Sequence, residues 1–201
     1  MRILALHGQR DDRLAGFLRE ESADVVALSG LARWDADRFD QLMRACGYPR
    51  GAFCVAPSGE HLGLLSRHPL MEVHCHTEGF AHGLIEAYCA GPRGYMLFLT
   101  HFDREHGSAE AELILARMRG HASALLIGTC MRVPGIRTDG QDVGSLFVRA
   151  GLLDAIGESE RGVRIADAVY VTFPLRIALA SAQVLEDRGI AHHAPIAVRL
   201  R

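Results

Sequence analysis

Short apolar runs separated by turn residues restrict the fold of this chain more than any other feature. Apolar runs of strand length, bounded by residues such as Gly, Pro, Asp and Ser, are typical of β-strands. They predict strands near residues 2–6, 23–28, 51–55, 62–66, 70–76, 82–89, 94–101, 123–128, 167–172, 179–184 and 195–200. Helical periodicity predicts helices near residues 11–20, 35–46, 106–119 and 142–149.

The order of these elements indicates how they are layered. Strands and helices alternate at first, hairpins dominate the middle of the chain, and alternation returns later. This order predicts an α/β (α+β) fold in which two mixed sheets pack face to face and helices cover the outer sides. Because no linker, repeat or low-complexity segment divides the sequence, we expect one domain over residues 1–201.

The charged residues exclude several kinds of chemistry. The chain contains 22 basic residues, all of them arginine, so a Schiff-base lysine or a P-loop lysine is excluded. The formal net charge is −2 at pH 7, which gives no electrostatic basis for tight nonspecific binding to nucleic acid. We therefore predict that nucleic acid is not a partner.

The cysteines and the apolar runs bear on location. The five cysteines include no CxxC pair, and their odd number does not suit a disulfide framework. No apolar run reaches membrane-spanning length, and the first residues read as a buried strand rather than an export signal. These observations predict a cytoplasmic protein that does not contact a membrane.

Eight ordered motifs resemble those of the endonuclease/exonuclease/phosphatase superfamily, which has the DNase-I-like fold. Each motif is weak alone, but together they span nearly the whole chain. They are MRILALHGQ (1–9), ADVVALSGLARWD (23–35), HLGLLSRHPL (61–70), FLTHFD (98–103), ALLIGTCMRVPG (124–135), GLLDA (151–155), RIADAVYV (164–171) and AHHAPIAV (191–198). The resemblance implies a four-layer α/β/β/α sandwich, with two packed mixed sheets flanked by helices.

The family hydrolyses phosphate esters with Mg²⁺, and the resemblance shows which ligands this chain lacks. The family's metal-binding Asn corresponds to His7, its metal-binding Glu to Gly30, and the Asp of its closing Ser-Asp-His motif to His192. Its Gly-Asp-Phe-Asn motif reads Gly-Thr-Cys-Met here, with Thr129 and Met131 replacing Asp and Asn. Since Mg²⁺ prefers oxygen ligands, ordinary Mg²⁺ phosphodiesterase chemistry is not expected.

The proton-transfer residues of the family remain. The resemblance assigns a catalytic set of His101, His193 and Asp167, in which the carboxylate orients the second histidine. It also assigns Arg67, Thr129 and Cys130 to substrate binding. Cys130 and Arg67 equally fit structural roles, as a small core residue and as the partner of a structural acid.

The replacements at the former Mg²⁺ site suggest another ion. His7 and His192, with Asp167 or His101 as a third ligand, would suit Zn²⁺ or Fe²⁺, which accept imidazole. The same two histidines equally fit an inactive pocket, in which they only fill space and form hydrogen bonds. We treat His82 and the other scattered histidines as ordinary polar residues.

Three functions therefore remain open. The first is a repurposed enzyme that applies His/Asp acid–base or His–metal chemistry to a small molecule. The second is a non-catalytic pseudo-nuclease that binds or scaffolds a protein partner. The third is residual metal-dependent phosphoesterase activity with displaced ligands, drawn from Glu60, Glu78, Glu86, Asp103 or Asp154.

Overall fold

The computed structural model describes residues 1–8, 11–129, 143–157, 167–186 and 188–201. Cys130 and Met131 therefore lie outside the described residues. The elements, in chain order, are β1 Arg2–His7, α1 Asp11–Glu21, β2 Val25–Ala32, α2 Ala36–Cys46, β3 Arg50–Cys54, β4 Glu60–Ser66, β5 Leu70–His76, β6 Leu84–Cys89, β7 Tyr95–His101, α3 Gly107–Met118, β8 Ala124–Thr129, α4 Val143–Arg149, β9 Leu153–Asp154, β10 Ala168–Val171, α5 Phe173–Ala178, β11 Leu179–Val184 and β12 Ile196–Leu200.

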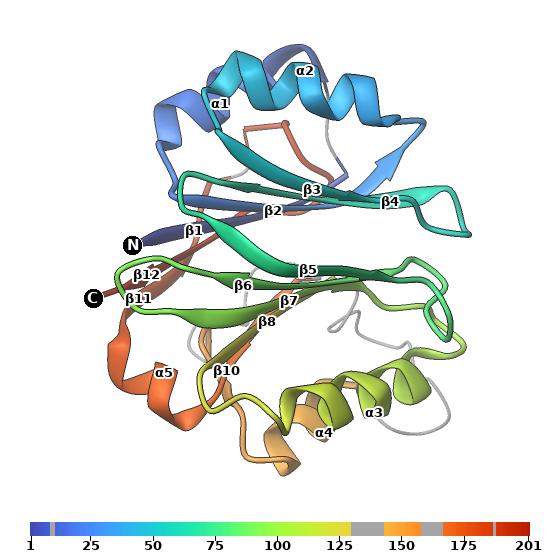
Figure 1. The fold of residues 1–201 in the computed structure, drawn as a ribbon, viewed down its shortest axis with the longest axis vertical. Coiled ribbons are helices and arrows are strands. Elements are labelled where there is room, and N and C mark those ends of the chain that lie inside the picture. The colour runs from blue at the N-terminus through green and yellow to red at the C-terminus, as the bar shows by residue number, and fades with distance from the viewer. Residues whose placement is uncertain (9–10, 130–142, 158–166, 187) are drawn as a thin grey trace.

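The described strands form two six-stranded mixed sheets that pack face to face, as the sequence predicts (Figure 1). The first sheet has the order β11-β12-β1-β2-β4-β3, and the second has the order β5-β6-β7-β8-β10-β9. Each sheet contains a parallel pair, β1 with β2 and β7 with β8, whereas the other pairings are antiparallel. The antiparallel neighbours bring the start of β4 and the start of β10 to the edge where β1 and β7 end.

Alternation along each strand divides the core into layers. In β1, Ile3 and Ala5 face the other sheet, whereas Leu4 and Leu6 face the helices. The same period of two recurs in β7, where Leu97 and Leu99 join the inter-sheet core and Phe98 joins the core beneath α3. This two-sided burial explains why most strands read as continuous apolar runs.

Helices cover both outer faces (Figure 1). α1 and α2 pack on the first sheet, and α3 and α4 pack on the second. The two termini lie on the same side of the sandwich, where the N-terminal ammonium donates to the carbonyl of Leu200 at 2.7 Å. No helix among the described residues has the length and hydropathy needed to cross a membrane.

The differences from the predicted elements are local. β2 runs to Ala32 rather than to residue 28, because a bulge at Gly30 lets the strand continue past the point where its pattern breaks. Helix α5 and the two-residue strand β9 were not predicted, because both are too short to show a period. A helix-start signal exists for α5, since Pro174 lies in the first turn after the N-cap Thr172.

Candidate functional site

The inter-sheet core ends in polar residues at one edge of the sandwich. In five strands, the inward-facing position at this edge is polar rather than apolar: His7 in β1, Ser29 in β2, Glu60 in β4, His101 in β7 and Thr129 in β8. Because side chains alternate along a strand, these five continue the rows occupied deeper in the sandwich by aliphatic residues. Two facing sheets therefore present their polar side chains to one another.

Four histidines at this edge form a continuous row of ring contacts, here called the histidine row. His82 stacks on His101 with ring centroids 4.2 Å apart, and His101 meets His7 edge to face at 4.7 Å. His7 in turn stacks on His193 at 4.9 Å with an interplanar angle of 13°. The structure thus brings together His7, His101 and His193 as predicted, and adds His82.

Glu60 lies at one end of the histidine row. Its Oε2 atom is 3.1 Å from Nδ1 of His101 and 3.6 Å from Nδ1 of His82. His82 Nδ1 is also 2.8 Å from the hydroxyl of Ser58. One ligand atom each from Glu60, His82 and His101 lies within 4.8 Å of the other two, the spacing expected of residues that could hold a metal ion.

Asp167 lies at the other end. Its Oδ1 atom is 3.8 Å from Nδ1 of His193, an ion-pair separation longer than a hydrogen bond. Asp167 is 2% exposed, and neither of these two atoms has a hydrogen-bond partner among the described residues. Catalytic contacts are often this long before substrate binds, so the pair fits a carboxylate–histidine dyad.

Burial keeps the two central rings neutral. Desolvation lowers the pKa of His7 to about 4, and the Asp167 carboxylate opposes this shift while His193, His192 and His82 reinforce it. Desolvation likewise lowers the pKa of His101 to about 3, with His7, His82 and His193 adding to the shift and Asp103 opposing it. At neutral pH both rings therefore carry a lone pair that can accept a proton or bind an ion.

Hydroxyl contacts link the two sheets beneath the histidine row. Nδ1 of His7 is 3.0 Å from the Oγ atom of Ser29, and that oxygen is 2.8 Å from Oγ1 of Thr129. Thr129 is 2% exposed, so its hydroxyl is buried in this contact. The role of Thr129 in substrate binding stays a prediction.

Gly30 makes room for the ring of His7. Its φ of +66° lies in the left-handed region, and a Cβ atom at this position would be 2.6 Å from Cε1 of His7. A longer side chain here would have to displace the ring. Of the described positions that the resemblance assigns to the Mg²⁺ site, His7 and His192 present imidazoles, Thr129 presents a hydroxyl and Gly30 has no side chain, whereas Mg²⁺ prefers carboxylate oxygens.

Two sets of hydrogen bonds position the histidines. The backbone N–H of His192 donates to the carbonyls of His7 and Gly8 at 2.8 and 2.9 Å, which holds the loop bearing His193 across the end of β1. The carboxylate of Glu110 in α3 is buried and accepts the N–H groups of Ala81 and Asp103, both at 2.9 Å. Glu110 thereby ties down the backbone beside His82 and just after His101.

Some predicted site residues are placed differently. His192 is exposed and packs against Gly8, with its ring centroid 6.0 Å from that of His7. Arg67 follows the far end of β4, where its Nε donates to the carbonyl of Ala23 and its guanidinium lies 4.9 Å from the Tyr48 ring centroid. Since β4 separates Arg67 from Glu60, the structure does not bring Arg67 to the histidines.

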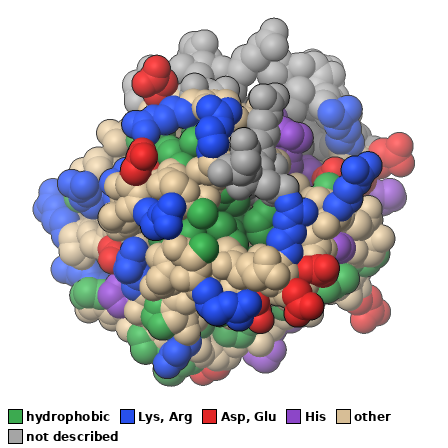
Figure 2. Space-filling view, turned by 90° about the horizontal axis from the view of Figure 1, so that it is seen from above, with side chains coloured by type: hydrophobic (Ala, Val, Ile, Leu, Met, Phe, Trp, Pro, Cys, Tyr) green, Lys and Arg blue, Asp and Glu red, His purple; other side chains and the backbone are tan. Residues whose placement is uncertain are grey.

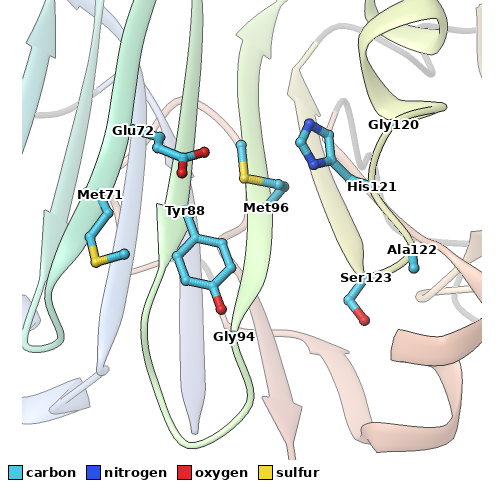
Figure 3. A pocket seen from close by; sticks show the side chains of 9 residues that line it. All are labelled: Met71, Glu72, Tyr88, Gly94, Met96, Gly120, His121, Ala122 and Ser123. Carbon is cyan, nitrogen blue, oxygen red and sulfur yellow. The ribbon is translucent and has the colours of Figure 1, made fainter.

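A pocket of about 500 Å³ lies elsewhere, at the end of β7 opposite His101. Figure 3 shows the side chains of Met71, Tyr88 and Met96 on neighbouring strands of the second sheet, with His121 facing them from the segment after α3. This pocket is open and contains none of the predicted site residues. The convergence of titratable groups identifies the histidine row as the better candidate site.

Sequence reasoning missed Ser29, Glu110 and His82, and it named Glu60 only as one of several substitute ligands. Ser29 and Glu60 share the inward parity of the apolar residues in their strands, so alternation alone could have placed them at this edge. His82 precedes β6 in a segment without a motif, and nothing in its local sequence marks it.

Comparison with solved structures supports the fold. No family model matches the chain, and no curated protein matches it either. Among solved structures, the 3′ phosphatase NExo from Neisseria bound to a product DNA hairpin aligns with a TM-score of 0.79 and 14% identity, covering 100% of this chain and 99% of that one.

Two further structures agree. An AP endonuclease from Archaeoglobus fulgidus aligns with a TM-score of 0.72 and 13% identity, over 100% of this chain and 99% of that one. An endonuclease/exonuclease/phosphatase from Beutenbergia cavernae aligns with a TM-score of 0.74 and 18% identity, over 100% of this chain and 71% of that one. The predicted resemblance is therefore confirmed at the level of the fold: this chain has the DNase-I-like α/β/β/α sandwich fold of these structures.

Proposed function

We propose that the chain is a repurposed enzyme that performs acid–base chemistry on a small molecule at the histidine row, without the Mg²⁺ site of its fold. The observation that carries this proposal is the dyad of Asp167 and His193 at the end of a row of contacting imidazoles. A carboxylate beside an imidazole fixes its tautomer and raises its basicity.

The two members of the dyad have different roles in this proposal. The His193 side chain is 28% exposed, so it can meet a substrate, whereas the Asp167 side chain is 2% exposed. His193 is the group that transfers the proton, and Asp167 acts through His193 as a positioning residue. In the metal-free protein, His101, on the other side of His7, is the second acid–base group.

A screen of small molecules tests the proposal. Purified protein is incubated with esters, amides, lactones, phosphomonoesters and sugar derivatives, with chelator present. For any compound that is turned over, His193→Gln and Asp167→Asn should lower kcat/KM about 10²–10⁴-fold, the usual contribution of general acid–base catalysis. The pH dependence of the rate should change in the Asp167 variant, which a purely structural role would not produce.

A matched control comes from the second sheet. His76 lies 2.9 Å from the carboxylate of Glu86 on the outer face, away from the histidine row, so His76→Gln removes a histidine from another imidazole–carboxylate pair. It should leave turnover unchanged. Equal turnover in wild-type protein and His193→Gln would overturn the proposal. An absence of turnover throughout the screen would favour the pseudo-nuclease with a protein partner.

A phosphoesterase with displaced ligands is the second candidate. The fold match to NExo favours it, as does the presence of Glu60 beside His101. Hydrolysis of bis(p-nitrophenyl) phosphate with Mg²⁺, Mn²⁺ or Zn²⁺ would support this function, and we expect no hydrolysis with Mg²⁺. Activity with Mg²⁺ that vanished in Glu60→Gln would replace the first proposal with the second.

Nucleic acid remains a partner to test, because NExo is bound to DNA and a second similar structure is an AP endonuclease. On the face that Figure 2 shows, arginines are spread out and interspersed with acidic residues rather than gathered into one stripe. With the net charge of −2, this face offers no continuous basic stripe for a phosphate backbone. Fluorescence anisotropy with a short labelled DNA duplex at low salt should therefore show no saturable binding.

A further inference from the structure

We infer that Glu60, His82 and His101 form a binding site for a divalent transition-metal ion of the Zn²⁺ class. The inference goes beyond the proposed function, because ion binding does not require turnover. The site differs in place and ligands from a Mg²⁺ site built on the ends of β1 and β2.

The geometry supplies three donors around one point. Nδ1 of His101 and Nδ1 of His82 both face Oε2 of Glu60, at 3.1 and 3.6 Å. The three ligand atoms lie within 4.8 Å of one another, so a small side-chain rotation brings them to the separations of ligands bonded to an ion at about 2.0–2.2 Å.

The kind of ion follows from the donor types. Two imidazoles and one carboxylate suit Zn²⁺, Fe²⁺ or Co²⁺, which accept nitrogen ligands, and they suit Ca²⁺ and Mg²⁺ poorly. The Glu60 side chain is 44% exposed, so the site opens towards solvent on one side. A fourth position there is accessible to water or to a small ligand, as in zinc sites that are not purely structural.

Groups around the site hold its ligands in place. Glu110 accepts hydrogen bonds from the N–H groups of Ala81 and Asp103. These bonds fix the backbone just before His82 and just after His101. The backbone N–H of Glu60 donates to the hydroxyl of Ser58, which holds the start of β4. The ion would take the place of that hydroxyl, 2.8 Å away, as the partner of His82 Nδ1. Backbone contacts around ligands orient them in metal sites.

The ion would also link the two sheets. Glu60 begins β4 of the first sheet, whereas His101 ends β7 and His82 precedes β6 of the second. An ion bound here would add a bonded link between the sheets to the Ser29–Thr129 hydroxyl contact at this edge. Zn²⁺ should therefore raise the melting temperature of the protein in proportion to the logarithm of its free concentration.

The test is a Zn²⁺ titration of metal-free, untagged protein in competition with a chromophoric chelator. We expect one equivalent to bind. Glu60→Gln and His82→Asn should each weaken binding at least ~100-fold, since even outer-shell substitutions commonly cost about 10–100-fold. The d–d absorption of bound Co²⁺ should also be lost in both variants, and circular dichroism checks that both remain folded.

Two control variants make the result specific. His192→Asn removes an exposed histidine outside the site, and Glu78→Gln removes an exposed carboxylate; both should bind Zn²⁺ as wild-type protein does. Binding well below one equivalent, or wild-type affinity in Glu60→Gln and His82→Asn, would overturn the inference. Loss of binding in His192→Asn alone would also overturn it, in favour of a site on His7 and His192. Because Asp167 is not a ligand, Asp167→Asn should keep Zn²⁺ affinity even where it abolishes turnover.

Discussion

Two clusters in this molecule combine histidines with a carboxylate, and they differ in what balances the charge. The outer-face cluster, on the second sheet, centres on Glu86, which lies 2.9 Å from His76, 3.4 Å from Arg117 and 3.7 Å from His121. The inter-sheet cluster comprises the histidine row with Glu60 and Asp167. Among the described residues, the ion pairs of Glu60 and Asp167 are to histidines.

This difference supports the proposal that the outer-face cluster is structural and the inter-sheet cluster reactive. Arg117 is positively charged at all ordinary pH values, so it balances Glu86 permanently. A carboxylate that faces only histidines has no permanent counter-charge, and its neighbours can gain or lose a proton or bind an ion. His7, His101 and Asp167 in the inter-sheet cluster are also buried between the two sheets, where a charge is costly.

The largest predicted effect is the loss of folding stability at acid pH, which arises from the inter-sheet cluster. His7 has its pKa lowered to about 4 from 6.5, so the unfolded chain binds a proton in a range where the folded chain does not. Stability is therefore unaffected above pH 6.5 and falls as the pH drops towards 4, by about 1.4 kcal/mol per unit or about 3 kcal/mol in total. His101 adds to this loss down to about pH 3.

Urea unfolding between pH 7.5 and 4, with chelator present, measures this slope. His7→Gln should flatten it, because the substituted side chain does not titrate. The packing cost of the substitution appears equally at pH 7.5 and is subtracted there. Parallel curves for wild-type protein and His7→Gln would show that the ring does not stay neutral on folding.

Much of the fold could be predicted from the sequence, because a strand that is buried on both faces has a continuous run of apolar residues. The strands predicted at residues 70–76 and 179–184 match β5 and β11, and the helix predicted at 35–46 differs from α2 by one residue. What the pattern could not show was the bulge at Gly30, because it depends on a left-handed backbone and on the ring that fills the space.

The candidate site was less predictable. The resemblance correctly led to the convergence of His7, His101 and His193, because it places the ends of β1 and β7 and the segment before β12 at one end of the sandwich. It could not reveal His82, which comes from a loop without a motif. A motif also carries no information on distance. It therefore could not show that Arg67 lies a full strand length from Glu60.

The next largest predicted effect is a loss of folding stability when Gly30, which packs against the His7 ring, is replaced. Gly30→Ala introduces a Cβ atom 2.6 Å from the His7 ring at a φ of +66°, whereas Gly47→Ala meets nothing within 4 Å at a φ of +70°. Both variants incur the left-handed strain of about 1–2 kcal/mol. Gly30→Ala should lose about 2 kcal/mol more, which is within the range for overpacking.

Thermal melts of the two variants measure this difference, at about 2–4 °C per kcal/mol for a chain of this size. When His7→Ala is the reference protein, the ring that collides with the new Cβ atom is absent. Adding Gly30→Ala to it should therefore cost little more stability than Gly47→Ala costs in wild-type protein. Equal destabilisation by Gly30→Ala and Gly47→Ala would mean that the His7 ring moves aside freely and that the inter-sheet cluster is loosely packed.

The smallest expected effect has opposite signs in the two clusters. Asp167 is buried, and its Oδ1 atom lacks a hydrogen-bond partner among the described residues, so the carboxylate costs desolvation without full compensation. Asp167→Asn keeps the shape and removes the charge, and should stabilise the protein by about 1 kcal/mol, as substitutions at functional sites often do. Glu86→Gln removes the charge that His76 and Arg117 contact and should destabilise the protein by about 1 kcal/mol.

Urea unfolding at pH 7 compares the free energies of unfolding of the two variants directly. A loss of stability in both variants would mean that Asp167 is held by its surroundings as firmly as Glu86, and the contrast between a reactive and a structural carboxylate would then fail.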